Sequence, residues 1–397
     1  MAEPDTSLLR DPLTFRDPYP AYAALRPHSP LQMSRSSWIL LSYEHVRAAL
    51  ADPERFSSNV RGSDNPVFRD SPLIFDDPPR HTQIRRIMTK AFTPKRVAEG
   101  EPWIREIAER LLDDVGSGVV DFQLGYCDPL PVFVIARMMG IPTDRVRDFK
   151  QWSEDRAFVI YNARGERTPE LIAAERGAQA INDWFAALVG ARAQSPGDDL
   201  ISALVSAEVE GEHLEPAEVV GACCVLLAAG NLTTTRLIGN MLRIFADDPA
   251  LWATVRADRS IIPLLVEEIM RLEAPVQTPI RKTTCDVEMG GKVIPAGSFV
   301  TIGIGAANHD GATFDDPEAV VPRRETPHLA FGHGIHFCLG AALARLEARV
   351  AFEALADRLD RLSLVSATRE DSGLGHRGHS QILLDMGPER PSLERDF

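Results

Sequence analysis

A glycine-rich segment around Cys338 constrains the fold and chemistry of this chain more than any other stretch. Residues 331–341 have the sequence FGHGIHFCLGA, and an alanine- and leucine-rich helix is predicted directly after them. The glycines permit tight turns and the close approach of a flat partner, where a Cβ atom would clash. The following helix points N–H groups and the positive end of its dipole at the sulfur, which favours the thiolate. Cys338 is therefore predicted to be a thiolate ligand rather than a buried core cysteine.

The pattern Phe-Gly-x-Gly-x-His-x-Cys-x-Gly, followed by Ala-x-Leu-Ala-Arg-x-Glu, resembles the haem-binding loop of bacterial cytochromes P450. A thiolate in such a loop can bind haem iron. Further matches in the family's order run from about residue 76 to residue 377. The resemblance implies a mainly α fold with a small β-rich part, a long central helix above the haem and the cysteine loop below it. It also implies that haem b is held by Cys338 as axial ligand, with Phe331, His336 and Gly340 at the cofactor.

The composition of the 397-residue chain narrows the classes of protein it can be. No linker-like composition break divides it, so residues 1–397 are predicted to form a single cytochrome P450 domain. With 57 acidic and 43 basic residues, the net charge of −14 disfavours bulk binding to nucleic acid or an anionic membrane. The polar start of the chain has no signal-peptide pattern, and no run of ~20 apolar residues predicts a membrane span. The five cysteines lack disulfide spacing, which indicates reduced thiols in a cytoplasm.

Four basic residues are candidates for binding the two haem propionates. His81 and Arg85 are four residues apart on a helix predicted over about 76–92, so they share one face. Such a pair by itself is more typical of a solvated cationic face. The family resemblance assigns both residues, together with Arg281 and His336, to the propionates. Carboxylates in a buried site need charge-assisted hydrogen bonds of this kind.

A long apolar segment from residue 218 to about 246 is predicted to be the helix above the haem. The family has Ala/Gly-Gly-x-Asp/Glu-Thr here, and Ala229, Gly230 and Thr233 match that pattern. The resemblance implies that Gly230 leaves space for oxygen and that the Thr233 hydroxyl donates a hydrogen bond to it. Leu232 stands where the acid is expected, preceded by Asn231. Proton delivery is then expected to depend on Asn231, water or the substrate, and Leu232 is expected to keep its side of the helix dry.

Glu268 and Arg271 are three residues apart on one face of a predicted helix. On a surface such a pair would contribute only ~0–1 kcal/mol. The resembled family has a buried Glu-x-x-Arg pair ahead of the cysteine loop, and a later arginine completes it. Arg323 is the candidate for this arginine, and Arg324 is its close rival. The resemblance gives the network a structural role in folding the cysteine loop.

Three further positions bear on the pocket or its surroundings. Residues 61–75 have no steady period and are predicted to form a loop, which in the family roofs the substrate pocket. Residues 376–380 form a polar turn where the family usually presents an apolar tip to the pocket. His309 stands where the family usually has arginine, and no function is assigned to this change.

The chain has no nucleotide, flavin, phosphate or hydrolase signature, so its electrons must come from other proteins. The resemblance identifies it as a soluble bacterial haem-thiolate monooxygenase that uses O2 and electrons from a ferredoxin and its reductase. The expected reaction is oxidation, chiefly hydroxylation, of a small organic substrate such as a natural-product intermediate. Two alternatives are left open. One is a peroxide-driven or coupling oxidase, favoured by Leu232; the other is a haem protein that binds a ligand without turnover.

A basic patch is predicted on the cysteine side of an otherwise acidic protein. Arg345 lies seven residues beyond Cys338, about two turns along the same helix. Its predicted neighbours are Arg85, Arg86 and Lys90. A patch of this kind would suit an acidic ferredoxin.

Overall fold

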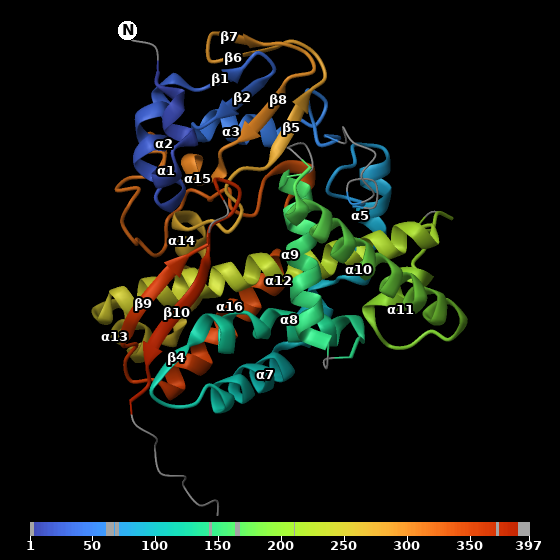
Figure 1. The fold of residues 1–397 in the computed structure, drawn as a ribbon, viewed down its shortest axis with the longest axis vertical. Helices are drawn as coiled ribbons and strands as arrows, with labels where there is room; N and C mark the ends of the chain where they lie inside the picture. Colours follow the sequence, from blue (N-terminus) through green and yellow to red (C-terminus); the bar gives the residue numbers. More distant parts are fainter. Residues whose placement is uncertain are drawn as a thin grey trace, which may run out of the picture.

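The computed structural model describes residues 4–60, 67, 71–142, 145–162, 167–209, 211–370 and 373–387. Most of the loop predicted over 61–75 therefore lies outside the described residues. Figure 1 shows a large helical body, with one group of strands gathered at one end and a smaller group along its side. The predicted mainly α fold with a small β-rich part is confirmed.

Helices make up most of the described chain. The α-helices are α1 (Pro12–Arg16), α2 (Tyr19–Leu25), α3 (Tyr43–Ala51), α5 (Arg80–Ala91), α6 (Pro94–Ala98), α7 (Glu101–Asp114), α8 (Pro129–Met139), α9 (Val146–Asn162), α10 (Pro169–Gln194), α11 (Leu200–Ser206), α12 (Pro216–Asp247), α13 (Pro249–Ala257), α14 (Ile262–Leu272), α15 (Ile304–Asn308) and α16 (Ala341–Arg358). Short 3₁₀ or π segments are η1 (Thr6–Arg10), η2 (Arg26–His28), η3 (Gln123–Cys127), η5 (Arg259–Ile261) and η6 (Gly334–His336).

The strands form three sheets. They are β1 (Leu31–Ser34), β2 (Ser37–Leu40), β3 (Phe56–Ser57), β4 (Val119–Asp121), β5 (Ile280–Thr283), β6 (Val287–Met289), β7 (Lys292–Ile294), β8 (Phe299–Ile302), β9 (Leu364–Arg369) and β10 (His379–Asp385). The largest sheet has the order β1-β2-β8-β5-β3, the second β4-β10-β9, and β6 pairs with β7. In the largest sheet β2 and β8 run parallel, with Trp38 opposite Val300.

The large sheet and its helices lead the chain to the cysteine loop. Leu40 on β2 and Ile302 on β8 belong to one buried cluster with Leu50 on α3 and Ala307 on α15. The cluster ends at Leu329, two residues before the loop begins. Ser42 caps the N-terminus of α3, because its side chain accepts a hydrogen bond from the His45 N–H.

Helix α12 runs across the middle of the molecule and packs against α8, α9, α10 and α16 (Figure 1). Its first turn has a capping box between Glu215 and Glu218, which satisfies N–H groups that lack partners inside the helix. Its 32 residues begin two positions before the predicted start. The sequence predicted no segment long and apolar enough to span a membrane. That prediction was wrong for α12, which among the described helices has the length and apolar composition of a span. Its place between other helices is that of a core element.

Candidate active site

The loop that carries Cys338 folds back on itself ahead of α16. The Cys338 N–H donates a hydrogen bond of 2.9 Å to the Phe331 carbonyl oxygen. Gly332 and Gly334 have φ angles of 74° and 72°, a left-handed conformation that other residues adopt only at a cost. A Cβ atom on Gly334 would also lie 2.5 Å from the Leu50 carbonyl oxygen. Glycine at these two positions is therefore required by the loop itself.

Cys338 and Gly340 line a cavity of about 350 Å³ at the N-terminus of α16. Burial raises the pKa of the free Cys338 thiol, whereas the N–H groups of Gly340 and Ala341 and the charges of Arg85 and Arg345 act in the opposite direction. A bound metal ion deprotonates a coordinating thiol outright. A Cβ atom on Gly340 would meet no atom within 4 Å, so a flat group has room beside the loop.

A cluster of basic side chains adjoins the same cavity; His81 is buried, and Arg85, Arg281 and His336 are half-buried. The His81 side chain, on a residue that is 1% exposed, has no hydrogen-bond partner for either ring nitrogen among the described residues. Its ring lies 4.3 Å from the ring of His336, measured between centroids. His336 Nε2 is 2.8 Å from Ser58 Oγ. Arg281 donates to the Ile280 carbonyl oxygen at 3.0 Å.

These groups are held in an environment that disfavours their charged forms. Burial lowers the pKa of Arg281 to about 10. Burial, and then the charges of Arg281, His81 and Arg85, lowers the pKa of His336 to about 3. Leaving a buried donor without an acceptor costs ~1–3 kcal/mol. A cluster of this composition therefore fits a group that brings carboxylates, as haem does with its two propionates. The structure places His81, Arg85, Arg281 and His336 together, as the sequence predicted.

A buried ion network on α14 supports the segment that leads to the loop. All five N–H donors of Arg271 have acceptors: both oxygens of Glu268 and the carbonyl oxygens of Asn308, Pro317 and Ala319. The side chains of Glu268 and Arg271 are 3% and 1% exposed, so this is a core pair rather than a surface pair. The Asn308 side chain in turn accepts from the Leu329 N–H at 2.8 Å.

The arginine that completes this network is Arg324, and the prediction of Arg323 was wrong. Arg324 Nε donates to Glu268 Oε1 at 2.9 Å, and its other nitrogens donate to nearby carbonyl oxygens. Arg323 has a φ angle of 69°, so the chain turns at this residue and its side chain leaves the network. The hydrogen bonds from Ser260, and then the charge of Arg323, lower the pKa of Asp258. The sequence alone could not fix which of two adjacent arginines would face Glu268.

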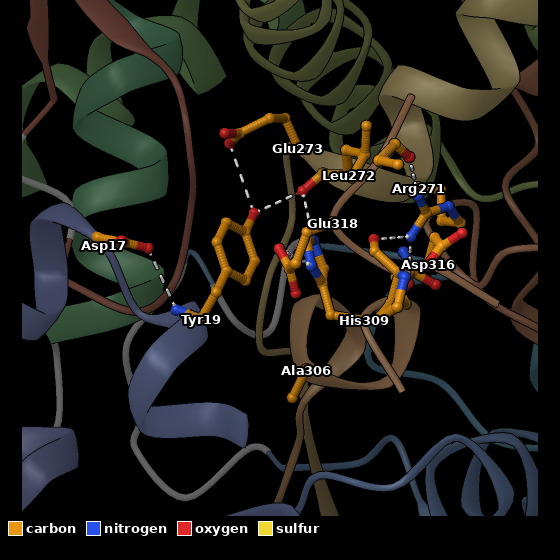
Figure 2. Close-up of polar contacts among 12 residues, drawn as sticks. Asp17, Tyr19, Arg271, Leu272, Glu273, Ala306, His309, Asp316 and Glu318 are labelled. Atoms are coloured by element: carbon orange, nitrogen blue, oxygen red, sulfur yellow. Dashed lines mark hydrogen bonds and ion pairs between the residues drawn. The ribbon is translucent and has the colours of Figure 1, made fainter. Parts of the chain in front are cut away.

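Figure 2 shows the neighbouring contacts around His309, where the family usually has arginine. His309 Nε2 and the Tyr19 hydroxyl both lie within hydrogen-bond distance of the Leu272 carbonyl oxygen, at 2.9 and 2.6 Å. His309 Nδ1 is 2.9 Å from Glu318 Oε2. The rings of Tyr19 and His309 stack at 3.9 Å between centroids. His309 thus ties α2, α14 and the 317–324 segment together, which is a structural role that the sequence reading did not assign.

On the opposite side of the cavity, Gly230 and Thr233 of α12 line the wall, as predicted. The Thr233 hydroxyl donates to the Ala229 carbonyl oxygen at 2.8 Å. Back-bonding of this kind loosens a helical turn. Thr233 therefore faces the cavity from a turn whose backbone bonding is weakened.

Asn231 does not face this cavity, so its predicted part in organising oxygen was wrong. Its amide is 1% exposed and donates to Ser153 Oγ on α9 at 2.8 Å. Two residues along an α-helix correspond to a rotation of about 200°, which puts Asn231 on the face opposite Thr233. Asn231 and Leu232 instead line a second, polar cavity behind α12. Leu232 therefore does not keep its side of the helix dry.

The polar turn at 376–380 also differs from the expectation. His379 and Ser380 line the second cavity behind α12, not the cavity of Cys338. Arg377 is 7% exposed and forms an ion pair with Glu273. This turn therefore contributes polar groups to the far side of α12 and to the core.

Glu347 is a functional candidate that the sequence reading did not single out. It is 1% exposed, it lines the Cys338 cavity, and its Oε2 has no hydrogen-bond partner among the described residues. Burial raises the pKa of Glu347 well above the usual range, which favours the neutral carboxyl group. The sequence contained one sign of Glu347, its place in the Arg-x-Glu part of the loop motif. That motif alone does not show whether the glutamate side chain is buried or exposed.

Comparison with known proteins agrees with this geometry. The Cytochrome P450 family model matches residues 30–128 and 173–364. The chain is 36% identical over 368 residues to erythromycin C-12 hydroxylase of Saccharopolyspora erythraea, covering 91% of this chain and 90% of that protein. It is 35% identical over 393 residues to vitamin D(3) 25-hydroxylase of Pseudonocardia autotrophica, covering 94% and 95%. The solved structure of cytochrome P450 CYP109Q5 from Chondromyces apiculatus is 37% identical with a TM-score of 0.86, covering 96% and 98%. The chain therefore belongs to the cytochrome P450 family, and it is a monooxygenase that binds haem through the Cys338 thiolate.

Proposed function

We propose that this enzyme hydroxylates a bulky, uncharged, largely apolar substrate, with electrons supplied in the cytoplasm by an acidic ferredoxin and its reductase. The observation that carries the substrate class is the lining of the Cys338 cavity. Away from the loop and the basic cluster, the described lining includes Leu73, Ile74, Val225, Leu226 and Val276. Apolar walls of this kind favour apolar ligands and penalise a charge that has no partner.

The charged side chains in the described lining of the Cys338 cavity have roles other than pairing with a substrate. Arg85 and Arg281 belong to the cluster that fits the haem propionates, and Glu347 is buried with its pKa raised by that burial. No other charged side chain among the described lining residues is available to pair with a charged substrate. Two relatives named above hydroxylate erythromycin and vitamin D3 according to their names, and these substrates are large. They support a substrate of similar bulk for this chain.

Haem supplies oxygen activation when it is bound, and the residues of this chain bind and orient the reactants. In the proposed function, Gly230 leaves space beside α12, and Thr233 lines the cavity with its hydroxyl group, whose proton bonds the Ala229 carbonyl oxygen until it is passed on. His81, Arg85, Arg281 and His336 hold the propionates. The apolar wall excludes water from the reacting substrate, which strengthens each hydrogen bond inside the site.

A spectral titration tests the substrate class. Neutral macrolide and sterol compounds should displace water from the haem site and shift its absorption band in a saturable way. Matched derivatives that carry a carboxylate should bind at least ~10-fold more weakly, a difference of about 1.4 kcal/mol. Stronger binding of the carboxylated derivatives would refute the proposed class. Product formed with ferredoxin and reductase, but not with hydrogen peroxide alone, would exclude the peroxide-driven alternative.

The basic patch for the ferredoxin rests on two cations beside Cys338. The charges of both Arg85 and Arg345 act on the Cys338 thiol, so both lie on the cysteine side of the site. Arg345 is 39% exposed and is paired with Glu267 at 2.6 Å. It also lies over the Phe331 ring, 4.4 Å from the centroid. The patch is therefore partly neutralised, and its field is weaker than the sequence suggested.

Neutralisation of Arg345 is a cleaner test than charge reversal, because a new carboxylate would face Glu267 directly. Arg345→Gln should slow reduction by ferredoxin and flatten its salt dependence, with substrate binding unchanged. Arg358→Gln is the matched control, because Arg358 is at the far end of the same helix and its side chain is 43% exposed. Equal reduction rates for the two variants would refute docking at this patch.

A further inference from the structure

Helix α12 separates two cavities that differ in chemistry. Gly230 and Thr233 face the cavity of Cys338. Leu232 and Arg236, on the opposite face, line a second cavity of about 240 Å³. Its charged and polar wall comes from α9, α12 and β10, together with Asp128 and Glu370. An acid at position 232, as the family pattern has it, would face this second cavity. The position that lacks the acid therefore borders a polar cavity behind the helical turn that carries Thr233.

The second cavity has one more carboxylate than it has cations. Lys150 forms an ion pair with Asp128, and Arg236 pairs with Glu370 at 2.9 Å. The third carboxylate, Glu154 on α9, has Lys150 Nζ at 3.8 Å, but that ammonium group is already bonded to Asp128. Glu154 is thus the acid in this cavity with the weakest cationic partner.

The surroundings of Glu154 favour its protonated form. Partial burial raises the pKa of Glu154, and Asp128 and Glu370 reinforce this, whereas Lys150 and Arg236 oppose it. His379 also lines the cavity, and burial lowers its pKa to about 3, so this imidazole is neutral. The Glu154 side chain is nevertheless 45% exposed. It can therefore exchange protons with solvent on one side and with the cavity on the other.

Water is the natural content of this space. His379 is 3% exposed, and its Nδ1 has no hydrogen-bond partner among the described residues. A polar cavity of about 240 Å³ has room for several waters, each of which needs two to four polar partners. Water in this cavity has both His379 and the carboxylates of the wall as polar partners.

We propose that Glu154 replaces the acid missing at Leu232, and that it passes protons through water in the second cavity to the turn of α12 that carries Thr233. Each turnover reduces one O2 with two electrons from the redox partner; one oxygen atom enters the substrate and the other leaves as water, so two protons are consumed. Glu154 releases a proton to the cavity water and regains one from bulk solvent through its exposed face. Glu154 acts through water and Thr233 and is a positioning and relay residue.

The turn between the two cavities is suited to such a transfer. Two side chains donate hydrogen bonds to carbonyl oxygens of this turn. The Thr233 hydroxyl donates to the Ala229 carbonyl oxygen, and Arg236 donates to the Leu232 carbonyl oxygen at 3.3 Å. Side chains that bond helix carbonyls in this way weaken the regular helical bonding locally. Transient opening of this turn would let one water connect the two cavities.

The test uses Glu154→Gln, which keeps the size of the side chain and removes its proton. The proposal rests on the monooxygenase function, so haem content and the substrate-induced spectral shift are measured first and should be unchanged. Product formed per electron should then fall and hydrogen peroxide should rise, by up to the ~10² fold at the lower end of general acid help. Asp155→Asn is the matched control on the same helix, because Asp155 bonds Gln151 and does not line the cavity.

Three readouts separate a relay from a structural effect. Infrared titration of the resting, haem-loaded enzyme should show a carboxyl group that titrates above the usual glutamate range in the wild type and is lost in Glu154→Gln, whereas the signal of the buried Glu347 stays in both. Adding Leu232→Asp to the Glu154→Gln variant should restore product per electron, because the new acid faces the same cavity. Glu154→Asp, which keeps an acid, should stay close to wild type.

Three outcomes would overturn the proposal. They are wild-type coupling in Glu154→Gln, an equal loss in Asp155→Asn, and no recovery in the double variant. If the wild type itself forms no product with its redox partners, the proposed function fails instead, and the two failures are distinguished by that first measurement.

Discussion

The two sides of the Cys338 cavity follow the family pattern to different degrees. On the cysteine side, the loop, the basic cluster and the Glu268–Arg271 pair all lie where the motifs place them. On the α12 side, Thr233 faces the cavity, but Asn231 and Leu232 face away from it. On the cysteine side, the loop needs particular residue types for its backbone turns and its charges, and a sequence motif contains those residue types. On the α12 side, the direction of each side chain depends on its angular position around the helix. A match at Thr233 therefore does not determine what the residues next to it contact.

The largest expected effect is at the cysteine itself. Cys338→Ser should abolish the strongly red-shifted ferrous–carbonyl band that thiolate ligation gives in this family. Cys285→Ser is the matched control, because Cys285 is an exposed free cysteine outside the cavity. An unchanged band in Cys338→Ser would show that Cys338 is not the haem ligand, and the two sides of the cavity could then not be compared as haem-binding and oxygen-binding sides.

The next effect concerns the buried network behind the loop. Glu268→Ala should cost ~3–5 kcal/mol, because it leaves Arg271 as an uncompensated buried charge. The measurement is haem incorporation together with the free energy of unfolding, and loss of haem is expected rather than slower chemistry.

Two adjacent arginines make this test specific. Arg324→Ala should weaken haem incorporation, because Arg324 donates to Glu268. Arg323→Ala should leave haem incorporation close to that of wild type, because its side chain lies outside the network. The reverse ranking would show that the contacts of these two neighbours have been exchanged.

This pair also shows where sequence reasoning reached its limit. The motif predicted a buried Glu-x-x-Arg and an arginine near position 323, but the choice between neighbours depends on the left-handed turn at Arg323. The same limit applies to Asn231. The sequence shows that this side chain is polar, but it does not show which face of α12 the side chain is on. The sequence contains no sign that Glu154 lies near α12, because only the packing of α9 on α12 brings it there. Contacts between distant elements are set by tertiary packing and leave no local pattern.

On the α12 side, two threonines separated by two positions sharpen the comparison. Thr233→Ala should increase hydrogen peroxide release and lower product per electron by up to ~10² fold, because the proton held at its hydroxyl is lost. Thr235→Ala should have a smaller effect, because Thr235 lines the second cavity behind the helix, where the proposed proton donor is Glu154 and not Thr235. The measurement is product, peroxide and electrons counted in the same reaction. Equal effects would mean that helical phase does not separate the two faces.

The smallest effect is expected at Glu267, next to Glu268 but near the surface. Burial would raise the pKa of Glu267, but hydrogen bonds from Arg345 and His328 outweigh it, and the pKa falls to about 2. A carboxyl group whose pKa is lower in the folded state stabilises the protein at high pH. This contribution is fully present above the ordinary value of 4.5 and is lost as the pH falls towards about 2.

Because the Glu267 side chain is 40% exposed, solvent screening should keep its contribution within ~0–1 kcal/mol. Glu267→Gln should therefore lower the free energy of unfolding slightly at pH 7, and the difference from wild type should shrink as the pH falls below about 4.5. Denaturant unfolding at several pH values measures both quantities. If Glu267→Gln instead costs as much as Glu268→Ala and loses haem, then Arg345 is held by a core ion pair. In that case Arg345 serves the cysteine loop rather than the docking of a ferredoxin.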